Sequence, residues 1–471
     1  MDPVEVEITS LGNNTEGIGI LPSGKKIFVD SPVIPGEICL VEVTEDKKNF
    51  SRGKCVELIK ESPFRIIPFG QEVPGANLAH MNYEMQLKVK SDKVRDCLTR
   101  IGKYDLNSSS FLKEIVPSER TEHYRNHMQY SLRDFRFCLK SQGTNDDVPV
   151  DDSPLEYVMF SSVRKTITAS FADYPTRLFD GVVLRGSERT GEVLIEFVSF
   201  ADMASEIIIR DASDFVKSAD LIGRLTGINV TGIMLRISNT ATEKRTRGGK
   251  RVCLYGRDYY NEELCGKLFR VKSGAFFQVN VPQAEVLYQL ATPSSYSGAL
   301  WDLYCGTGTV GLTVIDGKHK LMGVDISPEA IASARENAVS FGIDAEFICR
   351  PASKINALLA SVSRDDAVIV DPPRAGLEYS LIRSLLETGP SVISYISCDP
   401  ATLSRDLKLF TDSKIYQINS VTPVDMFPGT GHVETVCLLS NRKPDARVKI
   451  DVDLEDYYRI KDEQKKNKAS E

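Results

Sequence analysis

The chain has 471 residues, a length that predicts two or three domains rather than a single core. Its composition, with 42% hydrophobic and 26% charged residues, is ordinary for a soluble globular protein, and no apolar run is long enough to span a membrane. The net charge of −7 is not that of a protein coated in nucleic-acid contacts, so a polyanionic partner has to meet a local basic patch.

The compartment follows from the N-terminus and the cysteines. The first ten residues, MDPVEVEITS, are acidic and alternating, which is not the pattern of a signal peptide. Ten cysteines are scattered without a Cys-x-x-Cys pair, which argues against zinc and against a disulfide framework. We therefore expect a cytoplasmic protein with no resident metal.

Residues 1–59 predict a small β-barrel. Short alternating segments are separated by the turn sequences GNN, PSGKK and PGE. The segment carries six Lys and Arg against ten Asp and Glu, a net charge of −4. On this pattern alone, it is either a structural domain or a binding domain.

Residues 60–270 predict a mixed α+β domain. MNYEMQLKVKSDKVRDCLTRIG has helical periodicity, whereas RNHMQYSLRDFRFCLK and DGVVLRGSERTGEVLIEFVSF alternate as strands. Five basic residues then gather around two glycines: Lys244, Arg245, Arg247, Lys250 and Arg251. Such a cluster is either a solvated loop or a clamp for RNA phosphates, and the second reading makes this domain the RNA-binding one.

Residues 271–442 predict a doubly wound parallel sheet with a Rossmann-like order of strands and helices. The expected strands are ALWDLYC, KLMGVD, AEFICR, DAVIVD and SVISYIS, spaced by helical stretches such as SPEAIASARENAVSFG. Residues 443–471 form a charged tail. The expected fold class is thus α/β, with a central α+β domain and an N-terminal barrel.

The first of these strands is followed by a cofactor-type loop. DLYCGTGTVGL places Gly306 and Gly308 between a strand and a helix, where glycine lets the backbone turn tightly and approach a ligand. Asp325 ends the next strand and is placed to accept hydrogen bonds from ribose hydroxyls. A nicotinamide dinucleotide remains an alternative at this point.

Two further strand ends carry reactive or polar groups. Asp371 begins VDPPRAGL, in which two prolines enforce a rigid non-helical turn. Cys398 follows the buried run VISYIS and precedes a helix beginning near Pro400. Ligands bind at this edge of an open α/β sheet, so Cys398 is either a functional thiol or a simple buried cysteine.

The chain resembles the RNA (uracil-5-)-methyltransferases that use S-adenosylmethionine. The resemblance covers nearly all of residues 60–440, and residues 1–59 resemble the TRAM domain that many of these enzymes carry. Five motifs occur in the family's order: FFQVN, DLYCGTGTVGL, DPPRAGL, SCDPATLSRDL and DMFPGTGHVET.

The chemistry of this family defines roles for two residues. Carbon 5 of uracil is a poor nucleophile until a thiolate adds to carbon 6, and the carbon 5 proton must later be removed by a base. The resemblance implies Cys398 as the nucleophile and Glu434, in GTGHVET, as the base. His432 is an alternative base, and we expect it to act as a positioning group instead.

The resemblance also assigns cofactor contacts, namely Gln278, Tyr304, Asp325 and Asp371. Two positions depart from the family, which often has Asn at both. Thr309 changes a polar contact, and Asp399 places a carboxylate beside Cys398, which disfavours the thiolate unless it is turned away or paired.

An iron–sulfur cluster is not expected. Relatives with the barrel often hold one through cysteines just before a QH..Y..QL..K segment. Here His80, Tyr83, Gln86 and Leu87 match that segment, but no cysteine lies between Cys55 and Cys97. Four thiolates are the usual requirement.

The expected function is methylation of carbon 5 of one uridine in RNA. We expect the enzyme to be a monomer and to bind RNA but no membrane. The barrel favours 23S ribosomal RNA over transfer RNA by resemblance. Two other classes stay open: a non-catalytic RNA-binding or RNA-folding protein, and a methyltransferase for exocyclic amines, which would need no cysteine. RNA cytosine-5 enzymes would be expected to show a cysteine in the Asp-Pro-Pro motif, and DPPRAG has none.

Overall fold

The structure is a computed structural model that describes residues 2–30, 32–134, 136–141, 146–170, 178–200, 213–238, 248–351 and 359–442. The chain forms two compact units, and each is described by itself. Unit 1 comprises Met1–Thr121, Gln289–Tyr304 and Pro351–Glu471, and unit 2 comprises Glu122–Tyr288 and Cys305–Arg350. The domain boundaries expected from the sequence stay predictions. Within the described ranges, no helix combines the length and the apolar character needed to cross a bilayer.

The N-terminal domain of unit 1 is the expected small β domain. Its six strands have the order β1-β5-β6-β4-β3-β2. Their bounds are Val4–Glu7 (β1), Ser10–Leu11 (β2), Gly17–Ile20 (β3), Lys26–Asp30 (β4), Ile38–Asp46 (β5) and Phe50–Lys60 (β6). Alternate residues point inward, as period-2 strands require, and Val6, Ile27, Val29 and Val41 lie in the buried core.

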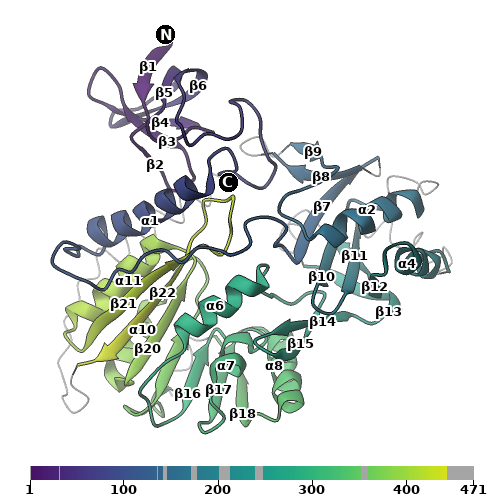
Figure 1. Ribbon diagram of the computed structural model, residues 1–471. Helices are drawn as coiled ribbons and strands as arrows, with labels where there is room; N and C mark the ends of the chain where they lie inside the picture. The colour runs from purple at the N-terminus through teal and green to yellow at the C-terminus, as the bar shows by residue number, and fades with distance from the viewer. Residues whose placement is uncertain are drawn as a thin grey trace. The chain divides into compact units, whose positions relative to one another are not determined.

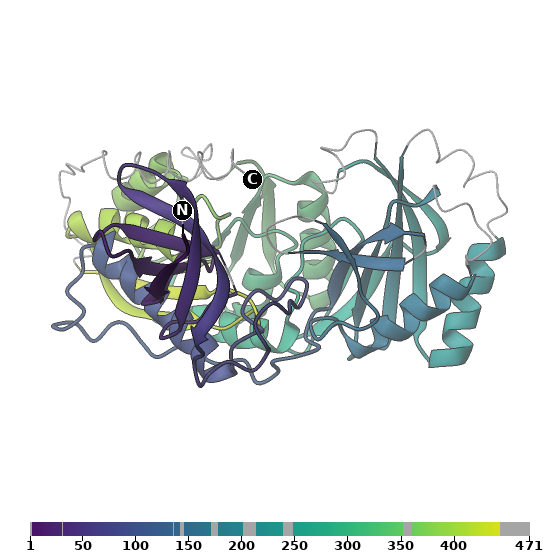
Figure 2. The same ribbon diagram turned by 90° about the horizontal axis from the view of Figure 1, so that it is seen from above.

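A long helix follows in unit 1. α1 (Tyr83–Arg100) begins at the N-cap Asn82, whose side chain accepts from the Met85 amide at 3.0 Å. Figure 1 shows α1 beside α11 (Pro400–Asp412) and below the barrel strands, which Figure 2 shows in front of the helix; β2 is in contact with α1. α1 is therefore packed between the barrel and the C-terminal part of unit 1.

Unit 2 contains a seven-stranded sheet with the order β13-β12-β11-β10-β7-β8-β9. The strand bounds are His127–Arg133 (β7), Arg136–Lys140 (β8), Asp147–Pro149 (β9), Gly181–Ser187 (β10), Glu192–Phe200 (β11), Asn229–Ser238 (β12) and Lys250–Gly256 (β13). α2 (Val158–Ser170) and α4 (Ser213–Thr226) lie against each other, and their apolar residues join the core of this sheet. β14 (Tyr259–Leu264) and β15 (Lys267–Lys272) form a hairpin, and α6 (Val281–Ala291) follows.

The C-terminal sheet has the order β18-β17-β16-β19-β20-β22-β21. Its strands are Leu300–Leu303 (β16), Leu321–Asp325 (β17), Ala345–Cys349 (β18), Ala367–Val370 (β19), Val392–Ser397 (β20), Tyr416–Val424 (β21) and Glu434–Asn441 (β22). The helices are α7 (Thr309–Val314), α8 (Pro328–Phe341), α10 (Tyr379–Thr388) and α11. All five strands expected from the sequence form, and the α/β fold class is confirmed.

One edge of this sheet differs from the expected parallel arrangement. β17 with β18, β16 with β19 and β19 with β20 pair in parallel, but β22 pairs antiparallel with both β20 and β21. The loop between β21 and β22 contains no helix, and a short connection of that kind can join only antiparallel strands. As a consequence, the start of β22 lies beside the end of β20.

Candidate active site

Three candidate residues meet at one edge of the C-terminal sheet, all of them in unit 1. Ser397 pairs with Thr435 in the antiparallel ladder of β20 and β22, so the next positions, Cys398 and Glu434, lie opposite each other. Asp371 directly follows β19, the parallel neighbour of β20. A thiol and two carboxyl groups therefore converge at adjacent strand ends.

The turn at Cys398 is shaped by its two neighbours. The hydroxyl of Ser397 accepts from the Asp399 amide at 3.2 Å, and the side chain of Asp399 caps α11 by accepting from Ala401 at 2.8 Å and Thr402 at 3.2 Å. The Asp399 carboxylate is thus paired with the helix N-terminus, where a negative charge is stabilised. The carboxylate is therefore paired, although its charge still adds to the rise that burial causes in the pKa of the Cys398 thiol.

The loop after Asp371 is held by buried charges on α11. Asp406 accepts from the Leu377 amide at 2.8 Å, and Arg405 donates to the carbonyl of Ala375 at 3.0 Å. Gly376 has a φ of 74°, and a Cβ there would come within 2.6 Å of both Arg405 and Asp406. The close packing fixes the Asp-Pro-Pro-Arg turn against the helix that begins after Cys398.

The electrostatics of the cluster favour protonated groups. Burial, with the nearby charge of Asp371, raises the pKa of Glu434 to about 8, and burial raises the pKa of Asp371 to about 7. Burial, followed by the charges of Glu434 and Asp371, raises the pKa of the Cys398 thiol to about 12, while Arg374 acts in the opposite direction. Perturbed acids gathered at a sheet edge are typical of catalytic sites.

Arg374 is a further site residue that the sequence reasoning did not single out. Its guanidinium lowers the pKa of both Cys398 and Glu434, and its Nη2 lies 3.3 Å from Nδ1 of His432. The only signal in the sequence is a cation directly after the Asp-Pro-Pro turn. The His432 ring packs edge-on against Phe427, with ring centroids 6.2 Å apart.

The cofactor-type loop of unit 2 is braced by Asp325. The Gly306 amide donates to Oδ2 of Asp325 at 3.0 Å, and the Ser327 amide donates to Oδ1 at 2.8 Å. Gly306 and Gly308 have φ values of 56° and 80°, which favour glycine. Each carboxylate oxygen retains a second lone pair, so Asp325 can still accept hydrogen bonds from a ribose.

The remaining predicted cofactor residues occupy separate elements. Gln278 is buried in unit 2, and its carbonyl accepts from Asn126 at 3.0 Å. Tyr304 follows β16 in unit 1 with a φ of 71°, an uncommon backbone conformation for a non-glycine residue. Thr309, the departure from the family pattern, accepts from the Tyr288 hydroxyl at 3.3 Å.

Comparisons with known proteins identify the family. The profile of the tRNA (uracil-5-)-methyltransferase family matches residues 241–442, and the TRAM domain profile matches residues 3–56. An uncharacterized RNA methyltransferase of Clostridium acetobutylicum is 32% identical over 460 residues, which cover 92% of this chain and 96% of that protein. The chain belongs to the RNA (uracil-5-)-methyltransferase family.

Two further relatives extend the match. An uncharacterized RNA methyltransferase of Porphyromonas gingivalis is 31% identical over 481 residues, covering 92% of this chain and 99% of that protein. The crystal structure of Pyrococcus abyssi tRNA (uracil-54, C5)-methyltransferase in complex with S-adenosyl-L-homocysteine has a TM-score of 0.72 and 25% identity, covering 93% of this chain and 100% of that chain. This RNA (uracil-5-)-methyltransferase is therefore an S-adenosylmethionine-dependent enzyme.

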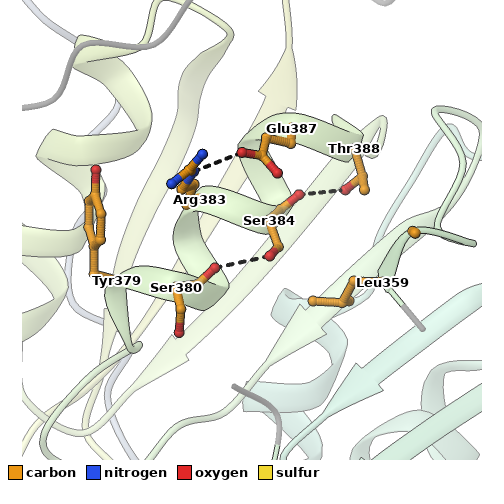
Figure 3. Close-up of a pocket in the computed structure, with 8 residues that line it drawn as sticks. Leu359, Tyr379, Ser380, Arg383, Ser384, Glu387 and Thr388 are labelled. Carbon is orange, nitrogen blue, oxygen red and sulfur yellow. Dashed lines mark hydrogen bonds and ion pairs between the residues drawn. The ribbon is translucent and has the colours of Figure 1, made fainter. Parts of the chain in front are cut away.

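Metal ligands and cavities add nothing to the methyltransferase site. Among the described residues, no group of three or more His, Cys, Asp or Glu side chains could hold a metal ion. A cavity of about 360 Å³ lies along α10, and Figure 3 shows that the hydroxyls of Ser384 and Thr388 bond within that helix. The residues lining this cavity include none of the predicted site residues.

Proposed function

We propose that the enzyme methylates carbon 5 of one uridine in 23S ribosomal RNA through a covalent bond between Cys398 and the uracil. The observation that carries the proposal is the register of β20 and β22, which sets Cys398 opposite Glu434 at the open edge of the sheet. A nucleophile and a base on the same pyrimidine need this proximity.

The reaction proceeds in two stages. In the first, the partly exposed Cys398 thiol gives its proton to solvent and the sulfur adds to carbon 6, which converts carbon 5 into an enolate carbon able to attack an electrophile. S-adenosylmethionine would supply the electrophilic methyl group and leave as S-adenosylhomocysteine. In the second stage, the Glu434 carboxylate removes the carbon 5 proton, the carbon 5–carbon 6 double bond re-forms and the sulfur leaves.

The pKa values of the cluster support these roles. A base is most effective when its pKa lies near the working pH, and Glu434, with a pKa of about 8, meets that condition. The Cys398 thiol, with a pKa of about 12, stays protonated in the free enzyme. Arg374 opposes that shift, and we propose that it supports the thiolate during addition.

The cofactor contacts are assigned in the same proposal. Asp325 would accept from the ribose hydroxyls, and Gly306 and Gly308 would let the backbone approach the cofactor closely. Gln278, Tyr304 and Asp371 are proposed as the other contacts, on the strength of their positions in the family motifs.

Transfer RNA is the alternative substrate. The Pyrococcus abyssi enzyme, a tRNA (uracil-54, C5)-methyltransferase, is matched over its whole length and over 93% of this chain, so the match extends into the barrel. A barrel of this kind is therefore compatible with transfer RNA as well, and the labelling assay below distinguishes the two RNAs.

One face of the barrel is suited to RNA. The outward rings of Phe28 on β4 and Phe50 on β6 pack edge to face, with centroids 5.6 Å apart. Lys26 lies 5.6 Å from the Phe28 ring centroid, and Arg52 lies 5.8 Å from it. Lys47 lies over Phe50 but pairs with Glu45 at 2.9 Å, and Arg52 lies 3.9 Å from the same carboxylate, so part of the positive charge on this face is neutralised. Aromatic rings among cations are typical of surfaces that bind single-stranded RNA.

A single assay separates the candidate substrates. Methyl-labelled S-adenosylmethionine is incubated with the enzyme and either ribosomal RNA or transfer RNA, each transcribed in vitro without modifications. The proposal predicts label in 5-methyluridine of 23S ribosomal RNA, and label confined to transfer RNA would establish the alternative. Label in an exocyclic amine, or equal activity of Cys398→Ala, would contradict the proposed chemistry.

The barrel face has its own control. Changing Phe28 and Phe50 to Leu should weaken RNA binding by roughly 1–3 kcal/mol for each stacked base that is lost. The control is Val56→Ala, at an exposed apolar position on β6, the strand that carries Phe50, and this change should leave the RNA affinity unchanged. Equal affinities for all variants would place the RNA contact elsewhere.

We also propose that the enzyme is a cytoplasmic monomer. All ten cysteines are free thiols, which suits a reducing compartment. Light scattering of the purified enzyme checks the oligomeric state.

A further inference from the structure

The loop that leads into Glu434 is fixed by residues from the N-terminal part of the chain. This loop, residues 425–433, joins β21 to β22. We call residues 425–433 the base loop. The base loop and the N-terminal residues that contact it both lie in unit 1, although they are more than three hundred residues apart in sequence.

Backbone groups at three positions of the base loop have partners from before or within α1. The Gly429 amide donates to Oε1 of Gln86 at 2.7 Å, and the Gly429 carbonyl accepts from the Leu78 amide at 2.8 Å. The Gly431 amide donates to Oδ1 of Asn77 at 2.9 Å. Two further partners of the base loop come from α1.

Those two partners are lysines. Lys93 donates to the Gly431 carbonyl at 3.3 Å and to the Asn13 carbonyl of the barrel at 3.1 Å. Lys90 donates to the Phe427 carbonyl at 3.0 Å and forms a fully buried ion pair with Asp425 at the root of the loop. A loop rich in glycine would otherwise be free to sample many conformations.

The barrel also touches the base loop directly. A Cβ on Gly431 would come within 2.3 Å of the Thr15 methyl group, and Nδ2 of Asn77 donates to the Thr15 hydroxyl at 3.2 Å. Thr15 has a φ of 68°, a strained conformation for a β-branched residue. Strain of this kind persists where the surroundings hold it, and such positions cluster near functional sites.

From these contacts we infer that Asn77, Gln86, Lys90 and Lys93 are positioning residues for the second stage of the reaction. They hold the base loop, and the base loop ends at Glu434. In that stage the Glu434 carboxylate takes the carbon 5 proton, the C–H electron pair forms the carbon 5–carbon 6 double bond and the sulfur of Cys398 leaves as a thiolate. The inference rests on the proposed function, because it acts through Glu434.

The inference makes a step-specific prediction that a purely structural role does not. Cys398 lies on the turn after β20 and is shaped by Ser397 and Asp399. Among the described residues, none of the four positioning residues is hydrogen-bonded to Ser397 or Asp399, although the charge of Lys93 interacts with that of Asp399. Loosening the base loop should therefore spare thiol addition and methyl transfer. It should slow removal of the carbon 5 proton, so the methylated covalent adduct should accumulate.

The test uses the full-length enzyme and RNA transcribed with 5-tritiated uridine, from both the ribosomal and the transfer pools. The loosening variant is Asn77→Ala combined with Lys93→Met, at two partly buried positions, and Asn77→Ala alone is run beside it because it keeps the charge of Lys93 near Asp399. The conservative variant is Asn77→Asp with Lys93→Arg, which keeps an acceptor for Gly431 and a donor for its carbonyl. The control is Lys88→Met, an exposed lysine of α1 that pairs with Asp92.

Three quantities are measured in a single turnover: methyl transfer to RNA, tritium release to water and the protein–RNA adduct on a denaturing gel. The loosening variant should transfer methyl at nearly the wild-type rate but release tritium roughly tenfold more slowly. A general base contributes about a hundredfold or more to the rate of proton removal, and a misplaced base should lose only part of that factor. Adduct should accumulate. The conservative variant should restore release, and Lys88→Met should match the wild type.

Glu434→Gln, run in parallel, separates the possible failures. If Glu434→Gln accumulates adduct and the loosening variant does not, the positioning role is wrong while the proposed function stands. A parallel fall of methyl transfer and tritium release in the loosening variant also overturns the positioning role. If Glu434→Gln itself accumulates no adduct, Glu434 is not the base, and the positioning role fails with it.

Discussion

Replacing Glu434 by Gln should stabilise the fold, and the gain should depend on pH. The folded protein holds the Glu434 proton up to about pH 8, whereas the unfolded chain releases it near the ordinary value of 4.5. Folding of the wild type therefore becomes less favourable as the pH rises through this window. A full shift of this size corresponds to roughly 5 kcal/mol at about 1.36 kcal/mol per pKa unit.

The expected gain is smaller than that limit. Asp371 contributes part of the rise in the pKa of Glu434, so the two carboxyl groups titrate as a coupled pair and the full shift does not belong to Glu434 alone. We expect Glu434→Gln and the wild type to be equally stable at pH 5, and the variant to be more stable by about 2–4 kcal/mol at pH 8.5.

The chain offers a convenient probe for this measurement. Trp301 is the single tryptophan, it is buried in β16 of the same sheet, and its Nε1 donates to Asp366 at 3.1 Å. Urea unfolding followed by its fluorescence, at pH values from 5 to 8.5, gives the stability difference. Glu387→Gln, on the exposed face of α10, is the control and should show no such trend. A difference that does not change with pH would refute the burial argument.

Three other outcomes are expected. Asp325→Ala should weaken binding of S-adenosylhomocysteine by about 1–3 kcal/mol in calorimetry, since polar partners lose their acceptor; equal binding would remove Asp325 from the cofactor site. Iodoacetamide at pH 7.5 should label Cys398 at least about tenfold more slowly than the exposed Cys349, because burial and nearby carboxylates raise the pKa of the Cys398 thiol; similar rates by peptide mass spectrometry would contradict this. Changing the five basic residues between 244 and 251 to Ser should lower RNA affinity and flatten its salt dependence; an unchanged slope would leave that cluster outside the RNA surface.

The strands and their ends were predictable because their signals are local. Runs such as VISYIS combine β-branched and aromatic residues and end at a turn, so β20 and the position of Cys398 follow from the sequence. The start of α11 was likewise marked by Pro400. The helix α1 was predicted from periodicity, although its buried Lys90 looks like a surface residue in the sequence.

What the sequence did not reveal depends on contacts between distant segments. The antiparallel pairing of β22 with β20 brings Glu434 opposite Cys398, and no local pattern encodes that partner choice. The ion pair between Lys90 and Asp425 joins residues 335 positions apart. Asp399 is engaged as a helix cap, which only the backbone geometry makes clear, and its charge still adds slightly to the rise that burial causes in the pKa of the Cys398 thiol.

Parts of two predictions lie outside the described residues. The residues outside the described ranges include three members of the basic cluster, Lys244, Arg245 and Arg247, and the charged tail, residues 443–471. Of the remaining members of the cluster, Arg251 pairs with Glu196 at 2.8 Å within unit 2. That guanidinium is therefore already engaged, which lowers the contribution expected from Arg251 to phosphate binding.

Trapping of the enzyme on RNA that contains 5-fluorouridine tests the central claim most directly. Fluorine cannot be removed as a proton, so the reaction should stop after methyl transfer with the sulfur still bonded to carbon 6. We predict a denaturant-resistant adduct that forms only with S-adenosylmethionine, maps to the peptide containing Cys398 and is abolished by Cys398→Ala. An adduct on another residue, or normal turnover of ordinary RNA by Cys398→Ala, would contradict the account.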